Sequence, residues 1–271
     1  MTFRTFAFAL AAMASLPGMQ RATPDIPRSF TPVRTEFDYD KREVEIPMRD
    51  GAKLHTVIFI PRGLKDPAPF LLTRTPYNAD GRATRANSPK LGAILPSADD
   101  VVAVSGYIRV YQDVRGKYGS EGEYVVNRPW RGPLNPTKVD HSTDTYDTIA
   151  WLLKNVPNNN GRVGTIGTSY DGFTTLMSLV DPHPALKAAV PINPMVDGWM
   201  GDDWFHMGAF RQTMASWIYD QTATRKNEEK WWSGARDDYD RFLRWGSAGA
   251  MGRAMGMEQL GFWNKLTSHP N

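Results

Sequence analysis

The sequence has no cysteine, no apolar run of transmembrane length and no block of like charge. Because none of its 271 residues is cysteine, disulfide bonds, thiolate metal sites and a cysteine nucleophile are excluded. The net charge is only +3, from 32 basic and 29 acidic residues that are scattered along the chain. Nucleic-acid binding needs basic residues gathered in a patch, so we do not expect it here.

Signals for a cofactor are also missing. No two histidines stand at a spacing typical of metal ligands, and no glycine-rich loop of the phosphate-binding type occurs. We therefore expect no metal and no organic cofactor. With 41% hydrophobic residues, the composition is that of an ordinary globular protein with a sizeable core.

The N-terminus carries the one pattern that bears on localisation. After Arg4, residues 5–16 form an apolar run that ends in small residues, which is typical of a secretory signal peptide. The run is too short to span a bilayer, since a transmembrane helix needs ~20 apolar residues. We predict a signal peptide over residues 1–22, cleaved between Ala14 and Ala22, and a secreted or periplasmic mature protein without a membrane segment.

Strand and helix patterns alternate over residues 43–192. Residues 43–60 change polarity at every second position around an Arg-Asp-Gly turn, which predicts a hairpin. Apolar runs predict strands, and apolar residues at helical spacing predict helices. The further strands are 69–74, 106–112, 162–166 and 187–192, and the helices are 140–156, capped by Asp140 or Ser142, and 173–180. This order predicts an α/β fold with a mostly parallel sheet and helices on both faces.

The character of the sequence changes at residue 198. Residues 198–271 are rich in Trp, Met, Arg and Gly and lack strand patterns, while helical spacing recurs over 203–219 and 227–244. We predict a mainly helical insertion over the sheet. Its tryptophans either line a pocket or pack against the sheet, and the sequence leaves both interpretations open.

Ser169 lies in the turn Gly167-Thr-Ser-Tyr-Asp-Gly172, between a predicted strand and a predicted helix. This arrangement is typical of a nucleophile elbow, in which a strained backbone lifts the serine hydroxyl above the sheet. The two glycines leave room for the sharp turn, and the Tyr170 amide points to where an oxyanion would form. The pattern departs from Gly-x-Ser-x-Gly, because Asp171 holds the second glycine position. The alternative is a serine that only caps the helix.

Four further segments carry a resemblance to a known family. They are Arg74-Thr-Pro-Tyr-Asn78, Tyr111-Gln-Asp-Val-Arg-Gly-Lys-Tyr-Gly-Ser-Glu-Gly122, Arg131-Gly-Pro-Leu-Asn-Pro136 and Val196-Asp-Gly-Trp-Met-Gly-Asp-Asp-Trp-Phe-His-Met-Gly-Ala-Phe-Arg-Gln212. Together with the Gly-x-Ser-Tyr-x-Gly turn, they resemble the α-amino-acid ester hydrolases, a branch of the X-Pro dipeptidyl-peptidase and cocaine-esterase group of α/β-hydrolases. The resemblance runs from about Phe37 to about Asp238.

The resemblance implies an incomplete α/β-hydrolase. Residues 23–197 would form the N-terminal part of the hydrolase domain, and residues 198–271 the start of a helical cap. The implied activity is hydrolysis of esters and amides of α-amino acids, including β-lactam antibiotics with α-amino acyl groups, through an acyl-enzyme on Ser169. The partner is then a small-molecule ester or amide, and we expect the full-length enzyme to be a homo-oligomer.

The resemblance also assigns roles to three residues beside Ser169. The Tyr170 amide and the Tyr77 hydroxyl are the oxyanion donors, and Asp203 holds the α-ammonium group of the substrate. From the residues alone, Tyr77 would be an ordinary strand-end tyrosine and Asp203 a helix cap. Asp202 remains the alternative register for the ammonium site.

The triad acid and histidine are not found in this chain. In this class they follow the serine in the order Ser, Asp or Glu, His. His183 follows the serine too closely, His206 stands where the family has a non-catalytic histidine, and His269 is close to the last residue. Because the family places the acid and base downstream of the cap, we expect a fragment that is inactive alone; a natural truncation or residues from another chain are the alternatives.

Two other functions stay open. One is a general carboxylesterase or X-Pro dipeptidyl-peptidase of the same superfamily, in which Asp203 would not select for an α-amino group. The other, of a different class, is a non-catalytic truncated product, since a serine without a base is only weakly nucleophilic.

Overall fold

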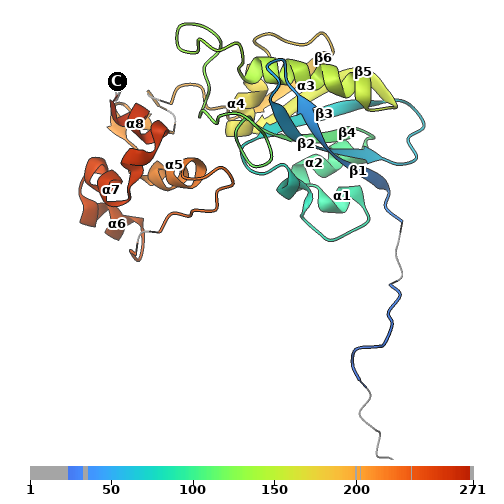
Figure 1. The fold of residues 1–271 in the computed structure, drawn as a ribbon, viewed down its shortest axis with the longest axis horizontal. Helices are drawn as coiled ribbons and strands as arrows, with labels where there is room; N and C mark the ends of the chain where they lie inside the picture. The colour runs from blue at the N-terminus through green and yellow to red at the C-terminus, as the bar shows by residue number, and fades with distance from the viewer. Residues whose placement is uncertain (1–23, 33–35, 199, 202, 233, 269–271) are drawn as a thin grey trace, which may run out of the picture. The chain divides into compact units, whose positions relative to one another are not determined.

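The computed structural model describes residues 24–32, 36–198, 200–201, 203–232 and 234–268 (Figure 1). The chain divides into two units, Met1–Thr35 and Glu36–Asn271. In the first unit, residues 24–32 are exposed and contain no helix or strand. The predicted signal peptide, residues 1–22, lies outside the described residues. No helix in the described ranges is long and apolar enough to cross a membrane.

A six-stranded sheet forms the centre of the second unit, in the order β1-β2-β4-β3-β5-β6 (Figure 1). Its strands are β1 (Tyr39–Pro47), β2 (Lys53–Pro61), β3 (Ala68–Thr75), β4 (Ile108–Asp113), β5 (Asn159–Thr168) and β6 (Leu186–Ile192). β4, β3, β5 and β6 run parallel, and β1 and β2 join antiparallel as the predicted hairpin. The predicted α/β fold with a mostly parallel sheet is confirmed.

Helices cover both faces of the sheet. α3 (His141–Asn155) lies on one face, and α1 (Leu91–Ile94) and α2 (Ser97–Val104) lie on the other (Figure 1). Alternate strand residues therefore enter two separate cores, one containing Ile58 and Leu152, the other Phe59 and Leu95. These two helices were not predicted, because α1 is a single turn and α2 has a short apolar face.

The start of α3 follows from its first residues. The Asp140 side chain accepts a hydrogen bond from the Thr143 amide, and the Thr143 hydroxyl accepts one from the Asp140 amide, which makes a capping box. Of the two predicted caps, Asp140 is therefore the one used. The next helix, α4 (Tyr170–Met177), contacts β3, β5 and β6 and begins directly after Ser169.

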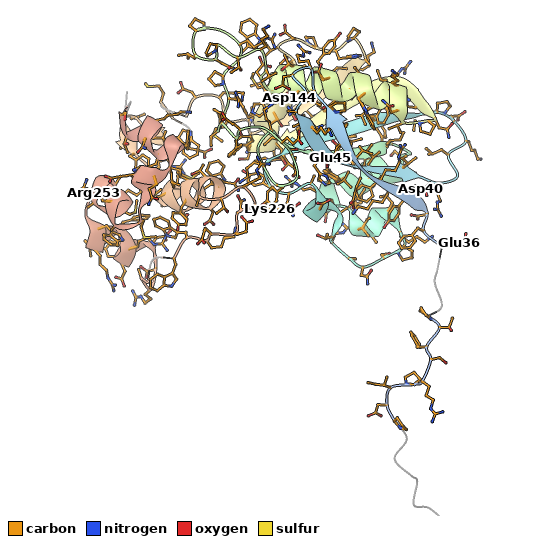
Figure 2. The ribbon with its side chains drawn as sticks, viewed as in Figure 1. Glu36, Asp40, Glu45, Asp144, Lys226 and Arg253 are labelled. Atoms are coloured by element: carbon orange, nitrogen blue, oxygen red, sulfur yellow. The ribbon has the colours of Figure 1, made fainter. Side chains whose placement is uncertain are left out.

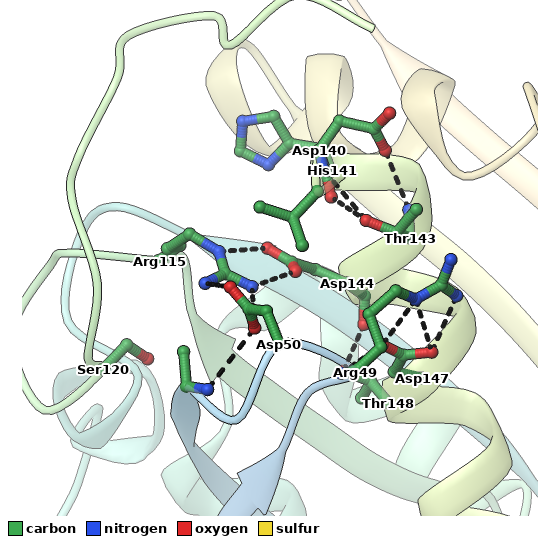
Figure 3. Close-up of polar contacts among 12 residues, drawn as sticks. Arg49, Asp50, Arg115, Ser120, Asp140, His141, Thr143, Asp144, Asp147 and Thr148 are labelled. Atoms are coloured by element: carbon green, nitrogen blue, oxygen red, sulfur yellow. Dashed lines mark hydrogen bonds and ion pairs between the residues drawn. The ribbon is translucent and has the colours of Figure 1, made fainter. Parts of the chain in front are cut away.

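Buried ion pairs hold α3 to the rest of the sheet domain. Asp144 lies on α3 (Figure 2), and its carboxylate accepts hydrogen bonds from Arg115 at 2.7 Å and from Arg74 at 3.3 Å. Arg115 also pairs with Asp50 in the β1–β2 turn, as Figure 3 shows. Asp144 is only 2% exposed, so water weakly screens its attraction to the two guanidinium groups. The two pairs therefore fix α3 to β3 and to the loop after β4.

The region after β6 is mainly helical, with one small hairpin. It contains β7 (Phe205–His206), β8 (Ala209–Phe210), η2 (Gln212–Met214), α5 (Ala215–Thr222), α6 (Asp238–Trp245), α7 (Ala248–Ala254), η3 (Met257–Gln259) and α8 (Gly261–Ser268). The expectation of no strands here is wrong, because two-residue strands leave no alternating pattern. The predicted helix 203–219 is wrong in its first half, where Met207 and Gly208 adopt positive φ and turn the hairpin. The predicted helix 227–244 begins only at Asp238.

Most of the aromatic residues of this region pack rather than face solvent. Trp204 and Trp263 are each 2% exposed and belong to a core that also contains Tyr170 of the elbow helix. Trp204 additionally lines a mainly apolar cavity of about 410 Å³, so both interpretations of the tryptophans apply to it. Trp232, in contrast, is 77% exposed.

Lys117 attaches α5 to the loop that follows β4. Its buried ammonium group donates hydrogen bonds to the carbonyl oxygens of Gln221 at 2.9 Å and Thr224 at 3.2 Å. A cation at the C-terminal end of a helix is favoured by the helix dipole. α5 therefore has a fixed position beside the sheet, which matters because it carries Trp217.

Candidate active site

Ser169 has the backbone of a nucleophile elbow. Its φ of 60° and ψ of −120° lie in a region that non-glycine residues rarely adopt. The strained turn is held by hydrogen bonds from the Ser169 amide to the Ile192 carbonyl oxygen, at 3.0 Å, and from the Phe173 amide to the Ser169 carbonyl oxygen, at 2.9 Å. Ser169 stands at the N-cap position of α4, yet its side chain makes no capping hydrogen bond, so the capping interpretation is wrong.

Two glycines make the turn possible for steric reasons. A Cβ atom on Gly167 would lie 2.3 Å from the Asp171 carbonyl oxygen. A Cβ atom on Gly172 would lie 2.5 Å from the Ile192 carbonyl oxygen. Both distances are far inside van der Waals contact, so the elbow requires glycine at both positions, as the sequence predicts.

Tyr77 follows the end of β3, and its hydroxyl group is fixed by a partner that no sequence pattern predicts. The indole Nε1–H of Trp217 donates a hydrogen bond to the Tyr77 hydroxyl at 3.3 Å. Burial raises the pKa of Tyr77 to about 12, although the Trp217 hydrogen bond opposes the rise. The phenol stays protonated at neutral pH, and because it accepts from Trp217, its own proton is free to be donated elsewhere.

Tyr170 is held by packing on all sides. Its ring is fully buried, stacks on Trp217 with the centroids 6.4 Å apart, and meets His141 and Phe173 edge-on. Its hydroxyl accepts a hydrogen bond from the Asn127 amide at 3.1 Å. Fixing this side chain also fixes the Tyr170 backbone amide, the first donor of α4.

Asp203 lies in an irregular segment and not at a helix start. The next helical residue is Gln212, so Asp203 is not a helix cap, and that alternative is wrong. Its carboxylate lies 3.9 Å from the Arg211 guanidinium group and is half-buried. Burial is the main cause of the raised pKa of Tyr77, and the negative charges of Asp171 and then of Asp203 raise that pKa further. Asp202 lies outside the described residues.

None of the described histidines forms a hydrogen bond with Ser169. His183 lies just before β6, which pairs with β5 from Val163 onward. Ser169 follows the other end of β5, so about 20 Å of strand separates the two residues. Its Nδ1 accepts a hydrogen bond from the Ala185 amide. His206 is exposed in β7, and His269 lies outside the described residues.

His141 is a further histidine near the elbow, and it precedes the serine in sequence. It is buried against Tyr170 and Phe173, and neither ring nitrogen has a hydrogen-bond partner. Burial, together with the charges of Arg74, Arg128 and Arg115, holds its pKa well below the usual value. A neutral, enclosed ring of this kind supports the packing of Tyr170 and does not activate a hydroxyl group.

The mixed sheet, the strand–Ser169–helix elbow and the helices on both faces define an α/β-hydrolase. The chain belongs to the X-Pro dipeptidyl-peptidase (S15) family, whose model matches residues 50–271. An aminopeptidase from a marine sediment Thaumarchaeota archaeon is 60% identical, with a TM-score of 0.85 over 93% of this chain and 41% of that one. A solved α-amino acid ester hydrolase is 56% identical, with a TM-score of 0.85 over 92% of this chain and 41% of that one.

Similarity to a curated protein is lower and covers less. The cocaine esterase of Rhodococcus sp. (strain MB1 Bresler) is 35% identical over 148 residues, which are 55% of this chain and 22% of that protein. The chain thus spans about two fifths of the matched solved structures and less than a quarter of the cocaine esterase. It is thus a member of the S15 family that spans part of its relatives' length, with a close structural match to an α-amino acid ester hydrolase.

Proposed function

We propose that this chain carries the nucleophile half of a serine acyl hydrolase that acts on esters and amides of α-amino acids. The observation that carries the proposal is the strained elbow at Ser169, with the hydrogen-bonded Tyr77 lining the same cavity as Gly167 and Thr168 of the elbow strand. The substrates are small molecules, and β-lactam antibiotics with α-amino acyl groups are among those that we propose.

The chemistry follows from these positions. The Ser169 oxygen attacks the carbonyl carbon while its proton passes to a base, and the negative charge that develops on the carbonyl oxygen is stabilised by the Tyr170 N–H and the Tyr77 O–H. When the carbonyl re-forms, the alcohol or amine leaves with that proton and an acyl-enzyme remains on Ser169. Water then attacks the acyl group by the same route, which releases the acid and restores the serine.

We propose that the base and its orienting acid come from the part of the complete enzyme that extends beyond this chain. The sheet supports this proposal. β6 pairs only with β5 among the described residues, and its side chains Val190 and Ile192 are 48% and 40% exposed. Parallel strands are normally covered on both faces, so this apolar edge suits further strands and helices of the same domain.

Asp203 provides the selectivity in this proposal. A carboxylate about 4 Å from an ammonium group contributes about 4 kcal/mol at an effective dielectric constant of 20, before desolvation is subtracted. That is enough to favour α-amino acyl groups over plain ones. The names of the two similar solved structures agree, because an aminopeptidase and an α-amino acid ester hydrolase both act next to an α-amino group.

The test of selectivity compares two substrates in the complete enzyme. Alanine methyl ester carries a free α-ammonium group, and its N-acetyl derivative does not. Asp203→Ala should lower kcat/KM for the first by about 10²-fold or more and leave the second within about threefold. Asp238→Ala, which removes an exposed carboxylate of the same region, is the control. If the preference survives in Asp203→Ala, a general carboxylesterase or X-Pro dipeptidyl-peptidase becomes the better proposal.

The test of the nucleophile uses a fluorophosphonate probe. The complete enzyme should be labelled at Ser169, and Ser169→Ala should not be labelled at all. The 271-residue chain should react far more slowly, since the proposal places the base outside it. Absence of labelling in both forms would favour a non-catalytic product.

Two further properties complete the proposal. We propose that residues 1–22 direct export, which predicts that the mature protein is found in the periplasm or medium and that deletion of these residues retains it in the cytoplasm. We also propose a homo-oligomer for the complete enzyme, to be measured by light scattering of the purified protein.

A further inference from the structure

One arginine touches each of the segments that surround the expected oxyanion site. Arg82 lies in η1 (Asp80–Ala83), shortly after Tyr77. Its Nη2 donates a hydrogen bond to the Thr75 hydroxyl at 2.7 Å and another to the carboxylate of Asp171 in the first turn of α4. The guanidinium carbon lies 5.7 Å from the centroid of the Tyr77 ring, within range of a cation–π contact.

These contacts link the two proposed oxyanion donors by a short path. Asp171 directly follows Tyr170, whose amide is one donor. Thr75 accepts a hydrogen bond from the Tyr77 amide at 3.1 Å, so it fixes the backbone of the residue that carries the other donor. The guanidinium group of Arg82 connects both sides.

The link explains why the elbow departs from the usual pattern. At the position where Gly-x-Ser-x-Gly has its second glycine, this chain has Asp171, a buried carboxylate only 6% exposed. The glycine requirement at Gly167 is separate, because a Cβ atom there would first meet the backbone carbonyl group of Asp171. A buried carboxylate is costly unless it is paired, and the ion pair with Arg82 supplies the partner.

The packing around Tyr77, Arg82 and Asp171 is less complete than that around Tyr170. A cavity of about 240 Å³ is lined by Tyr77, Arg82 and Asp171 among other residues, so these side chains have space to move. A displacement of about 1 Å in such a group can lower the rate of catalysis by ~10²-fold. The ion pair therefore adds to the packing of Tyr170 and connects the elbow to the segment that carries Tyr77.

We propose that Arg82 is a positioning residue that sets the separation of the two oxyanion donors through its ion pair with Asp171 and its contacts with Thr75 and Tyr77. The inference rests on the proposed function, because it assumes that Tyr170 and Tyr77 stabilise an oxyanion.

The test uses steady-state kinetics of the complete enzyme with alanine methyl ester at about pH 8, where Asp171, whose pKa burial raises to about 6, is ionised. Arg82→Gln should lower kcat by about 10- to 100-fold and change KM by less than about threefold. Phenylboronic acid forms a tetrahedral adduct on an active-site serine, and its inhibition constant should rise about tenfold or more.

The matched control is Arg85→Gln. Arg85 lies on the same segment and pairs with Asp100 at 3.0 Å, away from the elbow. This variant should keep the kcat of the wild type. The double variant of Arg82→Gln with Asp171→Asn should be no slower than Arg82→Gln alone, because both changes break one interaction.

The outcomes separate this inference from the proposed function. If Ser169→Ala turns over the ester as fast as the wild type, the proposed function and this inference are both wrong. With an active wild type, two results overturn only the positioning role. Either Arg82→Gln keeps kcat within about threefold, or its kcat falls while its affinity for phenylboronic acid is unchanged. If Arg82→Gln does not fold, Asp171→Asn decides by the same threefold limit in kcat, since it preserves the shape of the side chain.

Discussion

The indole N–H of Trp217 donates a hydrogen bond to the hydroxyl group of Tyr77 at 3.3 Å. The two residues come from distant parts of the sequence, the end of β3 and helix α5. The bond occupies one lone pair of the phenol and directs its proton away from α5. Because Lys117 fixes the end of α5, the loop after β4 also contributes to the orientation of Tyr77.

The first prediction concerns this bond. Trp217→Phe keeps the stacking on Tyr170 but removes the donor, so Tyr77 should lose its fixed orientation. Since a neutral hydrogen bond contributes about 0.5–1.5 kcal/mol, kcat of the complete enzyme should fall about 2- to 10-fold with little change in KM. Tyr77→Phe should cost more, about 10²–10³-fold. Trp232→Phe, at an exposed position, is the control, and equal activity of the two tryptophan variants would contradict the prediction.

The sheet could be predicted from the sequence because its strands carry their own signals. β3 and β4 are short apolar runs between turn residues, and Asp140 marks the start of α3. The region after residue 198 could not be predicted in the same way. The β7–β8 hairpin has two-residue strands, and its position follows from contacts such as the Trp204 amide with the Gly198 carbonyl oxygen.

The candidate site was predictable only where a local pattern exists. The elbow at Ser169 shows in six consecutive residues, because its glycines are required by contacts within the same turn and with β6. Trp217 and Arg82 left no such signal. Their roles arise from hydrogen bonds to residues far away in the sequence, and a tryptophan or arginine in a loop or helix has many ordinary explanations.

The second prediction tests the steric requirement of the elbow. In Gly172→Ala, the new methyl group would lie 2.5 Å from the Ile192 carbonyl oxygen, so β6 or α4 must shift. We expect a loss of about 1–3 kcal/mol in the free energy of unfolding, measured by urea denaturation, together with slower fluorophosphonate labelling of Ser169. Gly261→Ala, where no atom lies within 4 Å of the added group, should change stability by less than about 0.5 kcal/mol.

The third prediction concerns the buried ion pairs of α3. Asp144→Asn leaves the guanidinium group of Arg115 (Figure 3) and that of Arg74 buried with less compensating charge. Removing one partner of a buried pair costs about 3–5 kcal/mol of unfolding free energy. Asp40→Asn breaks the exposed pair with Arg62 and should cost less than about 1 kcal/mol. A similar melting temperature for the two variants would show that Asp144 does not hold α3 to the sheet.

The fourth prediction concerns the pH dependence of stability. Asp113, buried at the end of β4, accepts hydrogen bonds from the Ala79 amide at 2.7 Å and the Gly119 amide at 3.3 Å. Burial outweighs these bonds and raises its pKa from 3.8 to about 6. The folded protein then binds the proton more tightly than the unfolded chain. The resulting stability is fully present below about pH 4 and is lost as the pH rises through about 6.

Asp113→Asn removes this titration and so isolates its contribution. A shift from 3.8 to about 6 corresponds to about 3 kcal/mol, so the stability of the variant relative to the wild type should improve by up to that amount between about pH 4 and pH 7. Urea denaturation at several pH values measures the difference. Asp171 also has a pKa raised to about 6, but it titrates in the wild type and in Asp113→Asn alike. Its contribution therefore cancels in the difference between the two proteins. Asp66→Asn, at an exposed position, should give a curve parallel to the wild type. A parallel curve for Asp113→Asn would mean that its carboxyl group titrates alike in the folded and unfolded protein.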